Sequence, residues 1–182
     1  MENSSKKVLI RQIIIAVSVI ISLLVLDIVT KLVVHFHFKG VEGSNIVVIE
    51  DFFWIYLTYN KGAAFSIFAD VNVGRALLSI MSIIGTIVST GYLICKFKSL
   101  NIWYRIALYL FIPGCTGNLI DRVNIYNTPG VIDFLKFKLF GFYNFPVFNV
   151  ADMCLTCSII VFMIAIVISD KKKDKKDESV HG

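Results

Sequence analysis

Charged residues are scarce in this sequence. They make up 17% of its 182 residues, whereas 57% are hydrophobic and the mean hydropathy is +0.76. This composition leaves too little polar surface for an ordinary soluble domain. The net charge of +5 lies largely in the two chain ends, and no basic groove with interleaved aromatic residues is present. Nucleic-acid binding is therefore not expected, and the basic ends are interpreted as contacts with lipid headgroups.

Motifs for nucleophilic, phosphate-binding and metal chemistry are also missing. No Ser or Cys lies in a G-x-S-x-G turn, and the glycines of 114–118 are not followed by the Lys-Ser/Thr pair of a P-loop. The four cysteines include one Cys-x-x-Cys pair, Cys154 and Cys157, without a second pair or a neighbouring His. We interpret this pair as packing inside an apolar segment. Neither a cofactor nor a metal is expected.

Long apolar stretches are what the sequence does contain. A membrane-spanning helix needs about 20 apolar residues. Four stretches approach or reach this length, and they predict spans at approximately 12–34, 75–95, 103–122 and 150–169. Pro113 is expected to kink the third span, because proline removes a backbone hydrogen bond. The first stretch is too long for a signal-peptide core and no small-residue cleavage site follows it, so we expect it to be retained.

The positions of lysine and arginine predict the orientation of these spans. Cations precede the first span, link the second to the third and follow the fourth, but are few in the loops 36–74 and 123–149. By the positive-inside rule both termini are cytoplasmic. The predicted fold is a membrane α-helical domain over 1–169, with four transmembrane helices and a small extracytoplasmic β-rich subdomain. The charged cytoplasmic tail, 170–182, is expected to be disordered.

The two outer loops have the composition of folded structure. Residues 46–49 and 52–59 are rich in β-branched and aromatic residues and predict strands. A turn at 60–62 is expected to lead into a partner strand at 63–66. In the second loop a turn at 127–130 precedes a strand at 131–135, and seven aromatic residues follow between 134 and 148. Such rings are typical of a surface among lipid headgroups.

A first group of polar residues ends the third span. Asn118, Asp121 and Arg122 stand at positions i, i+3 and i+4 and therefore share one helix face. One interpretation is that Asp121 and Arg122 form only a helix-terminal ion network. The other is functional, since charges within membrane spans are costly and usually serve a function.

A second group consists of Asp133 in the second outer loop, with Asn149 and Asp152 at the start of the fourth span. In one interpretation Asn149 is simply an N-cap, and Asp152 is an acid that favours the helix dipole. In the other, two aspartates held close together share a proton, polarise a carbonyl and activate a water. This second chemistry requires no metal.

Two other classes of protein compete with a carboxylate enzyme. Intramembrane acids also mark proton-linked transporters and channels. Against that class, the acids gather at one face of the membrane and the sequence has no internal repeat. A purely structural membrane scaffold has no need of the two Asn-x-x-Asp pairs.

Five short segments resemble, in order, the motifs of the lipoprotein signal peptidases (signal peptidase II). Asp27–Lys31 resembles the D-x-x-[ST]-K motif and Asn60–Ser66 resembles N-x-G-x-A-F-S. Gly117–Arg122 matches G-N-x-x-D-R, Val131–Phe134 matches V-x-D-F and Phe148–Asp152 matches F-N-x-A-D. One departure is that Pro-Gly-Cys stands where the family usually has Gly-Gly-Ala, ahead of G-N-x-x-D-R.

The resemblance implies an intramembrane aspartyl endopeptidase of the bacterial cytoplasmic membrane, with its active site at the outer face. Its substrates would be diacylglyceryl-modified prolipoproteins, cut just before the lipidated Cys, and its other partners membrane lipids; no oligomer is expected. By the same resemblance Asp133 and Asp152 form the catalytic dyad. The resemblance further implies substrate-binding residues (Asn60, Gly62, Asn118, Arg122 and Asn149) and supporting residues (Asp27, Lys31 and Asp121).

Overall fold

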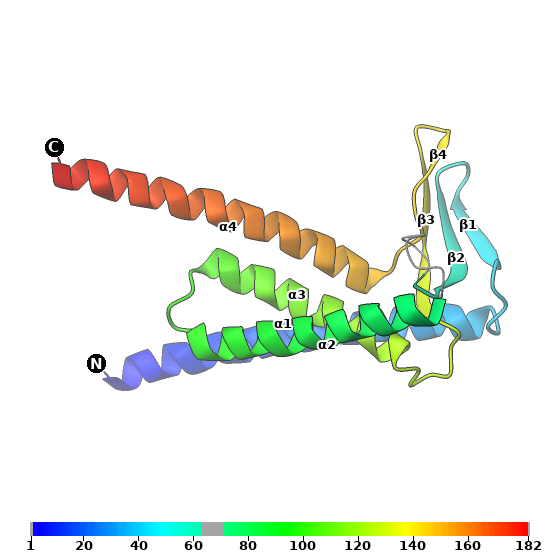
Figure 1. Ribbon diagram of the computed structural model, residues 1–182, viewed down its shortest axis with the longest axis horizontal. Helices are drawn as coiled ribbons and strands as arrows, with labels where there is room; N and C mark the ends of the chain where they lie inside the picture. The colour runs from blue at the N-terminus through cyan, green and yellow to red at the C-terminus, as the bar shows by residue number, and fades with distance from the viewer. Residues whose placement is uncertain (1, 63–70, 182) are drawn as a thin grey trace.

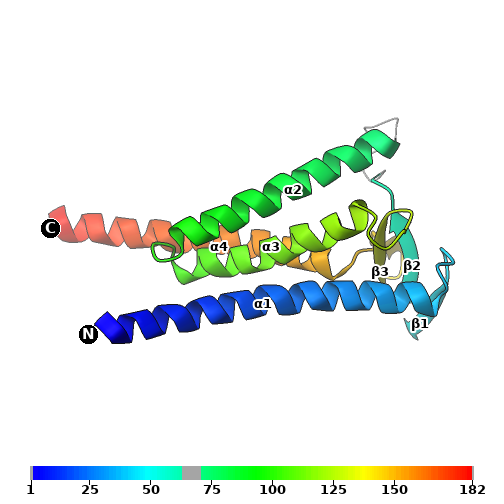
Figure 2. The same ribbon diagram turned by 90° about the horizontal axis from the view of Figure 1, so that it is seen from below.

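The computed structural model describes residues 2–62 and 71–181. Four helices run along the long axis of the molecule, and a small sheet stands across one end of them (Figures 1 and 2). Both termini lie at the opposite end from the sheet (Figure 1). In chain order the elements are α1 (Glu2–His37), β1 (Asn45–Ile49), β2 (Phe53–Asn60), α2 (Val71–Lys96), α3 (Ile102–Arg122), β3 (Val131–Leu139), β4 (Tyr143–Asn144) and α4 (Val150–His181).

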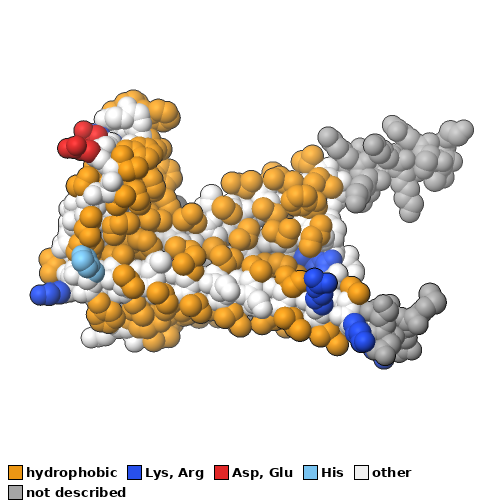
Figure 3. Space-filling view, turned by 180° about the vertical axis from the view of Figure 1, so that it is seen from behind, with side chains coloured by type: hydrophobic (Ala, Val, Ile, Leu, Met, Phe, Trp, Pro, Cys, Tyr) orange, Lys and Arg blue, Asp and Glu red, His pale blue; other side chains and the backbone are white. Residues whose placement is uncertain are grey.

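Three helices of the described chain are long and apolar enough to cross a membrane, at Lys6–His37, Val73–Lys96 and Val150–Ser169. Many of their large apolar side chains face outward, and hydrophobic atoms cover much of the helical surface (Figure 3). Exposure of so much apolar surface to water would be unfavourable, whereas contact of the same surface with the hydrocarbon of lipids carries no such cost. The protein is therefore a multi-pass membrane protein.

Helix α3 is the central element of the bundle. It packs against α1, α2 and α4, and much of its last half is buried. Asn101 caps its first turn by accepting a hydrogen bond from the amide of Tyr104 at 3.1 Å. Such a side-chain cap satisfies one of the free amides at a helix start. Pro113 lies inside the helix and is buried, with helical residues on both sides.

The tail 170–182 differs from the expectation of disorder. Helix α4 continues through it as far as His181. Lysine and glutamate favour helix, and a helix that has already formed extends without a new nucleation step. Charge and low hydrophobicity therefore did not end the helix at the membrane boundary.

The sheet is antiparallel with the order β1-β2-β3-β4. The strand expected at 63–66 lies outside the described residues, and β2 pairs with β1 and with β3. A bulge between Ile55 and Thr58 shifts the register, so that Thr58 stands opposite Asp133. This pairing joins the two outer loops and brings the end of β2 to the beginning of β3.

Apolar packing holds the sheet against the end of α1. A buried cluster combines Val34 of α1 with side chains of both central strands, namely Leu57, Tyr59, Ile132 and Phe134. Leu57 and Ile132 are fully buried. Burying a large apolar side chain contributes roughly 1.5–3 kcal/mol. The cluster therefore sets the position of β3, and of Asp133 within it, relative to the helices.

The aromatic residues of 134–148 behave in two ways. Phe137 stacks between Phe53 and Phe148, with ring centroids 4.6 and 5.8 Å away. Phe140 and Phe142, at the turn between β3 and β4, are instead 84% and 79% exposed. The first set stiffens the sheet, and the second forms an apolar tip at its far end.

Candidate functional site

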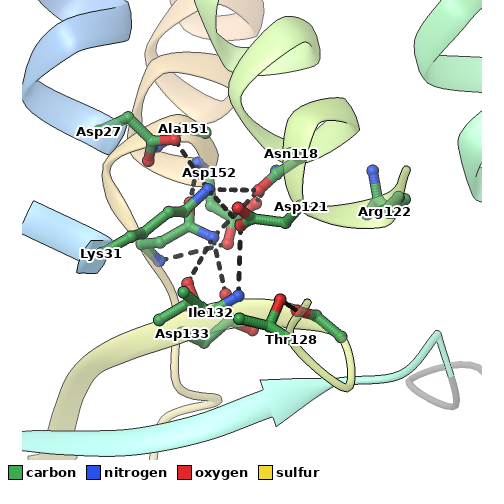
Figure 4. A network of polar contacts seen from close by, with 12 residues as sticks. Asp27, Lys31, Asn118, Asp121, Arg122, Thr128, Ile132, Asp133, Ala151 and Asp152 are labelled. Carbon is green, nitrogen blue, oxygen red and sulfur yellow. Dashed lines mark hydrogen bonds and ion pairs between the residues drawn. The ribbon is translucent and has the colours of Figure 1, made fainter. Parts of the chain in front are cut away.

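Buried polar residues gather where α1, α3 and α4 meet strand β3 (Figure 4). Each of them is at most 2% exposed, although they come from four separate segments of the chain; they are Asp27, Lys31, Asn118, Asp121, Asp133 and Asn149. Asp152 is only partly buried beside them. Burial of so many polar groups is unfavourable unless each one has partners.

A buried ion triad joins α1 to α3. The Lys31 ammonium lies 2.7 Å from Asp27 Oδ2, one helical turn earlier, and 3.0 Å from Asp121 Oδ2. Asp27 Oδ1 accepts a hydrogen bond from the amide of Ala151 at 2.8 Å, and Asp121 Oδ2 accepts one from the amide of Ile132 at 3.3 Å. The triad therefore also connects to α4 and β3.

The glycine of the Gly117–Arg122 motif has a steric role in this packing. A Cβ atom at Gly117 would collide with the Asp27 carboxylate and approach the Ala151 side chain to 3.2 Å. The absence of a side chain at this position is what lets α1 and α4 approach α3 so closely.

Two asparagine amides connect the two aspartates of the second group. Asn149 Nδ2 lies 2.7 Å from Asp133 Oδ1 and 3.0 Å from Asn118 Oδ1. Asn118 in turn donates from Nδ2 to Asp152 Oδ1 at 2.7 Å. A chain of polar contacts thus runs from Asp133 through both amides to Asp152.

Asn149 and Asp152 also cap the start of α4. The amide of Asp152 donates to Asn149 Oδ1 at 2.9 Å, and the amide of Asn149 donates to Asp152 Oδ2 at 3.3 Å. This is the reciprocal arrangement of a capping box. The N-cap interpretation of the pair is therefore correct, and it is not the only role, because the same two side chains also take part in the amide chain.

Asp133 has the electrostatics of a carboxyl group that can hold a proton near neutral pH. Burial raises its pKa to about 7, and the negative charge of Asp152 adds to the rise. Lys31 and hydrogen bonds from Asn60 and Asn149 act in the opposite direction and lower the pKa. The rise is mainly a desolvation effect, since a buried carboxylate loses its hydration.

Arg122 does not contact the amide chain directly. Its Nη1 donates to Ser82 Oγ on α2 at 2.9 Å, and its carbonyl accepts from Arg75 Nε and Nη2 at 3.2 and 3.1 Å. It still interacts electrostatically with Asp133 and Asp152. Ser82 and Arg75 had no motif that could have marked them from the sequence.

The ion network at the end of α3 differs from the Asp121–Arg122 network that the sequence suggested. The cation that faces Asp121 is Lys31, not the adjacent Arg122. Neighbouring residues of a helix point in different directions, whereas a residue from another helix can approach the buried face. Sequence adjacency was therefore a poor guide to the partner of Asp121.

Strand β2 ends at Asn60, which hydrogen-bonds to Asp133, and Gly62 follows two residues later. The amide of Gly62 donates to Asn60 Oδ1 at 3.0 Å, and Gly62 has a φ of +88°. A side chain would be strained in this left-handed conformation, which explains the glycine. The rest of the N-x-G-x-A-F-S motif, residues 63–66, lies outside the described residues.

The cysteines take no part in this site. All four are free; Cys115 and Cys154 are buried, and Cys95 and Cys157 are exposed. Across residues 2–62 and 71–181, no group of three or more His, Cys, Asp or Glu side chains is arranged to hold a metal ion.

Known proteins are similar to this chain in sequence and in fold. A profile of the signal peptidase (SPase) II family, peptidase family A8, matches residues 19–168. The lipoprotein signal peptidase of Clostridium tetani is 37% identical over 154 residues, which is 84% of this chain and 92% of that protein. The lipoprotein signal peptidase of Staphylococcus aureus is 31% identical over 162 residues, covering 89% and 93%.

Two solved structures of bacterial membrane enzymes, determined by the in meso method, are similar in fold. One has a TM-score of 0.71 at 29% identity and covers 87% of this chain and 90% of its own. The other has a TM-score of 0.68 at 31% identity and covers 83% and 91%. With a buried set of aspartates and asparagines where three helices meet one strand, and with a family match across most of its length, the chain belongs to the signal peptidase II family of aspartic peptidases.

Proposed function

We propose that this membrane peptidase removes signal peptides from diacylglyceryl-modified prolipoproteins, cutting just before the lipidated Cys, with Asp133 and Asp152 as its catalytic dyad. The observation that carries the assignment is the chain of amides between them: Asn149 contacts Asp133, and Asn118 contacts Asp152, each at 2.7 Å. The names of the relatives support the substrate class.

The environments of the two carboxyl groups suggest different roles. Asp133 is 2% exposed and its pKa is raised to about 7, so it holds the shared proton. The more exposed Asp152 accepts a proton from the attacking water, whose oxygen bonds to the scissile carbonyl carbon while Asp133 protonates the carbonyl oxygen. As the C–N bond of the resulting diol breaks, Asp152 gives its proton to the amine nitrogen and one diol hydroxyl returns a proton to Asp133. The products are a carboxylic acid and an amine, and no covalent enzyme intermediate forms.

Five residues near the dyad are proposed to bind the substrate backbone: Asn60, Gly62, Asn118, Arg122 and Asn149. Asn60 and Gly62 lie at and just after the end of β2, Asn118 and Arg122 in the last turns of α3, and Asn149 just before α4. Arg122 has five N–H donors, of which Nη1 contacts Ser82, and it is suited to a peptide carbonyl. Asp27, Lys31 and Asp121 support these residues through the buried triad.

An apolar cavity supports a membrane-embedded substrate. It has a volume of about 780 Å³ between α2, α3 and α4. On α3 it is lined by Tyr104, Ala107, Leu108 and Phe111, and continuing this helix face by two turns reaches Asn118. The apolar part of a signal peptide in this cavity would lead its cleavage site toward the dyad.

The proposed topology has four spans, cytoplasmic termini and a site at the outer face of the bacterial cytoplasmic membrane. Helix α3 is added to the three apolar helices as a further span. It is shorter and more polar than they are, and it lies at the centre of the bundle. Both chain ends, whose sequences are rich in lysine, lie at the opposite end from the sheet, which agrees with the positive-inside rule (Figure 1).

The test is cleavage by purified enzyme in lipid vesicles, with a diacylglyceryl prolipoprotein and the same precursor without its lipid. The lipid chains remain in the bilayer before and after docking, so they mainly set the depth of the cleavage site. We expect a product that begins at the lipidated Cys, and at least tenfold slower cleavage of the unlipidated precursor. Equal turnover of both at the same membrane concentration would refute the role of the lipid, and no cleavage of either would refute the function.

A further inference from the structure

Lys31 is a charged residue buried among apolar helices, and the mechanism above gives it no direct task. Its side chain is 1% exposed. Within the described part of the chain, its polar partners are Asp27 at 2.7 Å, Asp121 at 3.0 Å and Asn118 Oδ1 at 3.3 Å. The first two contacts balance charge. The third contact joins Lys31 to Asn118, whose amide contacts Asp152 of the candidate dyad.

The contact with Lys31 is one of two that fix the orientation of the Asn118 amide. Asn118 Oδ1 lies within hydrogen-bond distance of two nitrogens, Lys31 Nζ at 3.3 Å and Asn149 Nδ2 at 3.0 Å. An ammonium group has no acceptor lone pair, so the atom that faces it must be the amide oxygen. The NH₂ group of Asn118 is then the group that faces Asp152 Oδ1, at 2.7 Å.

We propose that Lys31 is a positioning residue for the cleavage reaction: its ammonium holds the Asn118 amide in the orientation that donates to Asp152. The proposal rests on the proposed function of the dyad. It gives the buried Lys31 a role beyond the ion pairs with Asp27 and Asp121.

Loss of the ammonium would remove one of the two donors to Asn118 Oδ1 and leave Asn149 Nδ2, so the amide would be held less firmly and would turn more often. The turned amide would present its oxygen to Asp152, so that two acceptors faced each other in place of a hydrogen bond. The Asp152 carboxylate would then lose the donor that holds it, while Asn149 would keep its contact with Asp133. We therefore expect an effect on the chemical step, in which Asp152 takes part.

The charge of Lys31 also reaches Asp133. The charged groups around Asp133 are Asp152 from α4, Lys31 from α1 and Arg122 from α3. Burial and Asp152 raise the pKa of Asp133, whereas Lys31 lowers it. If Asp133 holds the shared proton, removal of the Lys31 charge should move the alkaline limb of the pH–rate profile to higher pH.

The experiment needs variants that do not leave two buried carboxylates unpaired. Asp121 Oδ2 accepts from both Lys31 and the amide of Ile132, and an asparagine at this position keeps one oxygen for both donors. We therefore compare Asp121→Asn with Lys31→Met/Asp121→Asn. The pair differs only at Lys31, and the double variant has the same formal triad charge as the unaltered enzyme.

Both variants are assayed with diacylglyceryl prolipoprotein in vesicles across the pH range, together with thermal unfolding in detergent. We expect kcat of the double variant to be about 10- to 100-fold below that of Asp121→Asn, the factor for loss of one hydrogen bond from a charged donor. The alkaline limb of the pH–rate profile should move to higher pH. Equal kcat values and superimposable pH profiles would overturn the proposal.

A second variant keeps the test decisive if the methionine protein does not fold. Lys31→Gln/Asp121→Asn retains an N–H donor at this position without the charge. Its kcat should fall below that of Asp121→Asn, because a neutral donor holds Asn118 Oδ1 less strongly than an ammonium does, and the alkaline limb should still move to higher pH. A kcat equal to that of Asp121→Asn with an unshifted limb would overturn the proposal. If the unaltered enzyme fails to cleave, the proposed function itself fails, which distinguishes the two results.

Discussion

At the scale of single residues, the candidate site depends on polar groups that are buried but provided with partners. Asp133 and Asn149 are at most 2% exposed, and Asn149 contacts the carboxylate of Asp133 at 2.7 Å. Such a network is specific because an unpaired group within it is costly. Single substitutions at these positions should therefore change the cleavage rate or the stability of the fold, and activity assays and thermal unfolding distinguish the two effects.

Asp133→Asn and Asp152→Asn should each give a folded, membrane-inserted protein with almost no cleavage. Asparagine keeps the shape of the side chain but removes the group that exchanges a proton. Loss of one catalytic acid or base lowers the rate by about 10²- to 10⁴-fold. Initial rates in detergent micelles measure the effect, and near-normal cleavage by either variant would remove that residue from the dyad.

Asp121→Asn should reduce activity less than either dyad substitution. Its carboxylate contacts Lys31 and the amide of Ile132, and not the amide chain between the dyad aspartates. The same cleavage assay measures all three variants. A rate below that of Asp133→Asn, with normal unfolding behaviour, would place Asp121 in the dyad instead.

Asp133 should also make the protein less stable as the pH rises. Its pKa is raised by burial to about 7 from a usual value of 3.8, so the folded protein binds the proton more tightly than the unfolded chain does. Stability from this group is then present at low pH and is lost between about pH 4 and pH 7. Thermal unfolding at pH 5 and pH 8 should show a larger decrease for the unaltered protein than for Asp133→Asn; equal decreases would contradict the raised pKa.

At the scale of elements, the site exists because three helices and one strand approach one another closely. The amide of Ala151 at the start of α4 donates to Asp27 on α1, and the amide of Ile132 on β3 donates to Asp121 on α3. Backbone groups at element ends thus bind the carboxylates of other elements. Gly117 on α3 is what permits the approach of α1.

Gly117→Ala should destabilise the protein by about 1–3 kcal/mol, the usual cost of overpacking. The new Cβ would collide with the Asp27 carboxylate. Gly91→Ala on α2 is the matched control, because a Cβ there meets no atom within 4 Å and alanine favours helix. The unfolding temperature in detergent should therefore fall for Gly117→Ala and stay the same or rise for Gly91→Ala. Equal unfolding temperatures would mean that the two helices separate without cost.

At the scale of the whole molecule, an apolar bundle carries a polar site at one end and both chain termini at the other (Figure 1). The family assignment replaces the two competing classes, a proton-linked transporter and a structural scaffold, with a peptidase. The arrangement fits a substrate that is itself anchored in the membrane. Its orientation in the bilayer can be tested without reference to activity.

Single cysteines introduced into a cysteine-free variant should report this orientation. We expect the cysteine-free variant to remain active, since no cysteine has a role in the proposed mechanism. Phe140→Cys, at the tip between β3 and β4, should react with an impermeant thiol reagent added outside intact cells, and Ser179→Cys only after the membrane is opened. The reverse pattern would invert the proposed topology.

Local sequence was sufficient for some of these features, because they depend on properties of nearby residues. Runs of apolar residues marked the membrane helices, and β-branched and aromatic residues marked the segments that became β2 and β3. The Asn149–Asp152 capping box depends on a spacing of three residues and was visible as an N-cap. The membrane class and the candidate aspartates followed from these signals together with the family motifs.

Tertiary structure alone decided which polar groups meet. Lys31 contacts Asp121 and Asn118 from a distant part of the chain. The bulge in β2 places Thr58 opposite Asp133. Arg122 contacts Ser82 on another helix. Each of these partners depends on how closely helices and strands pack, which no local pattern specifies. Burial, which raises the pKa of Asp133, is likewise a property of the assembled bundle, since a carboxyl group loses its water only when other elements cover it.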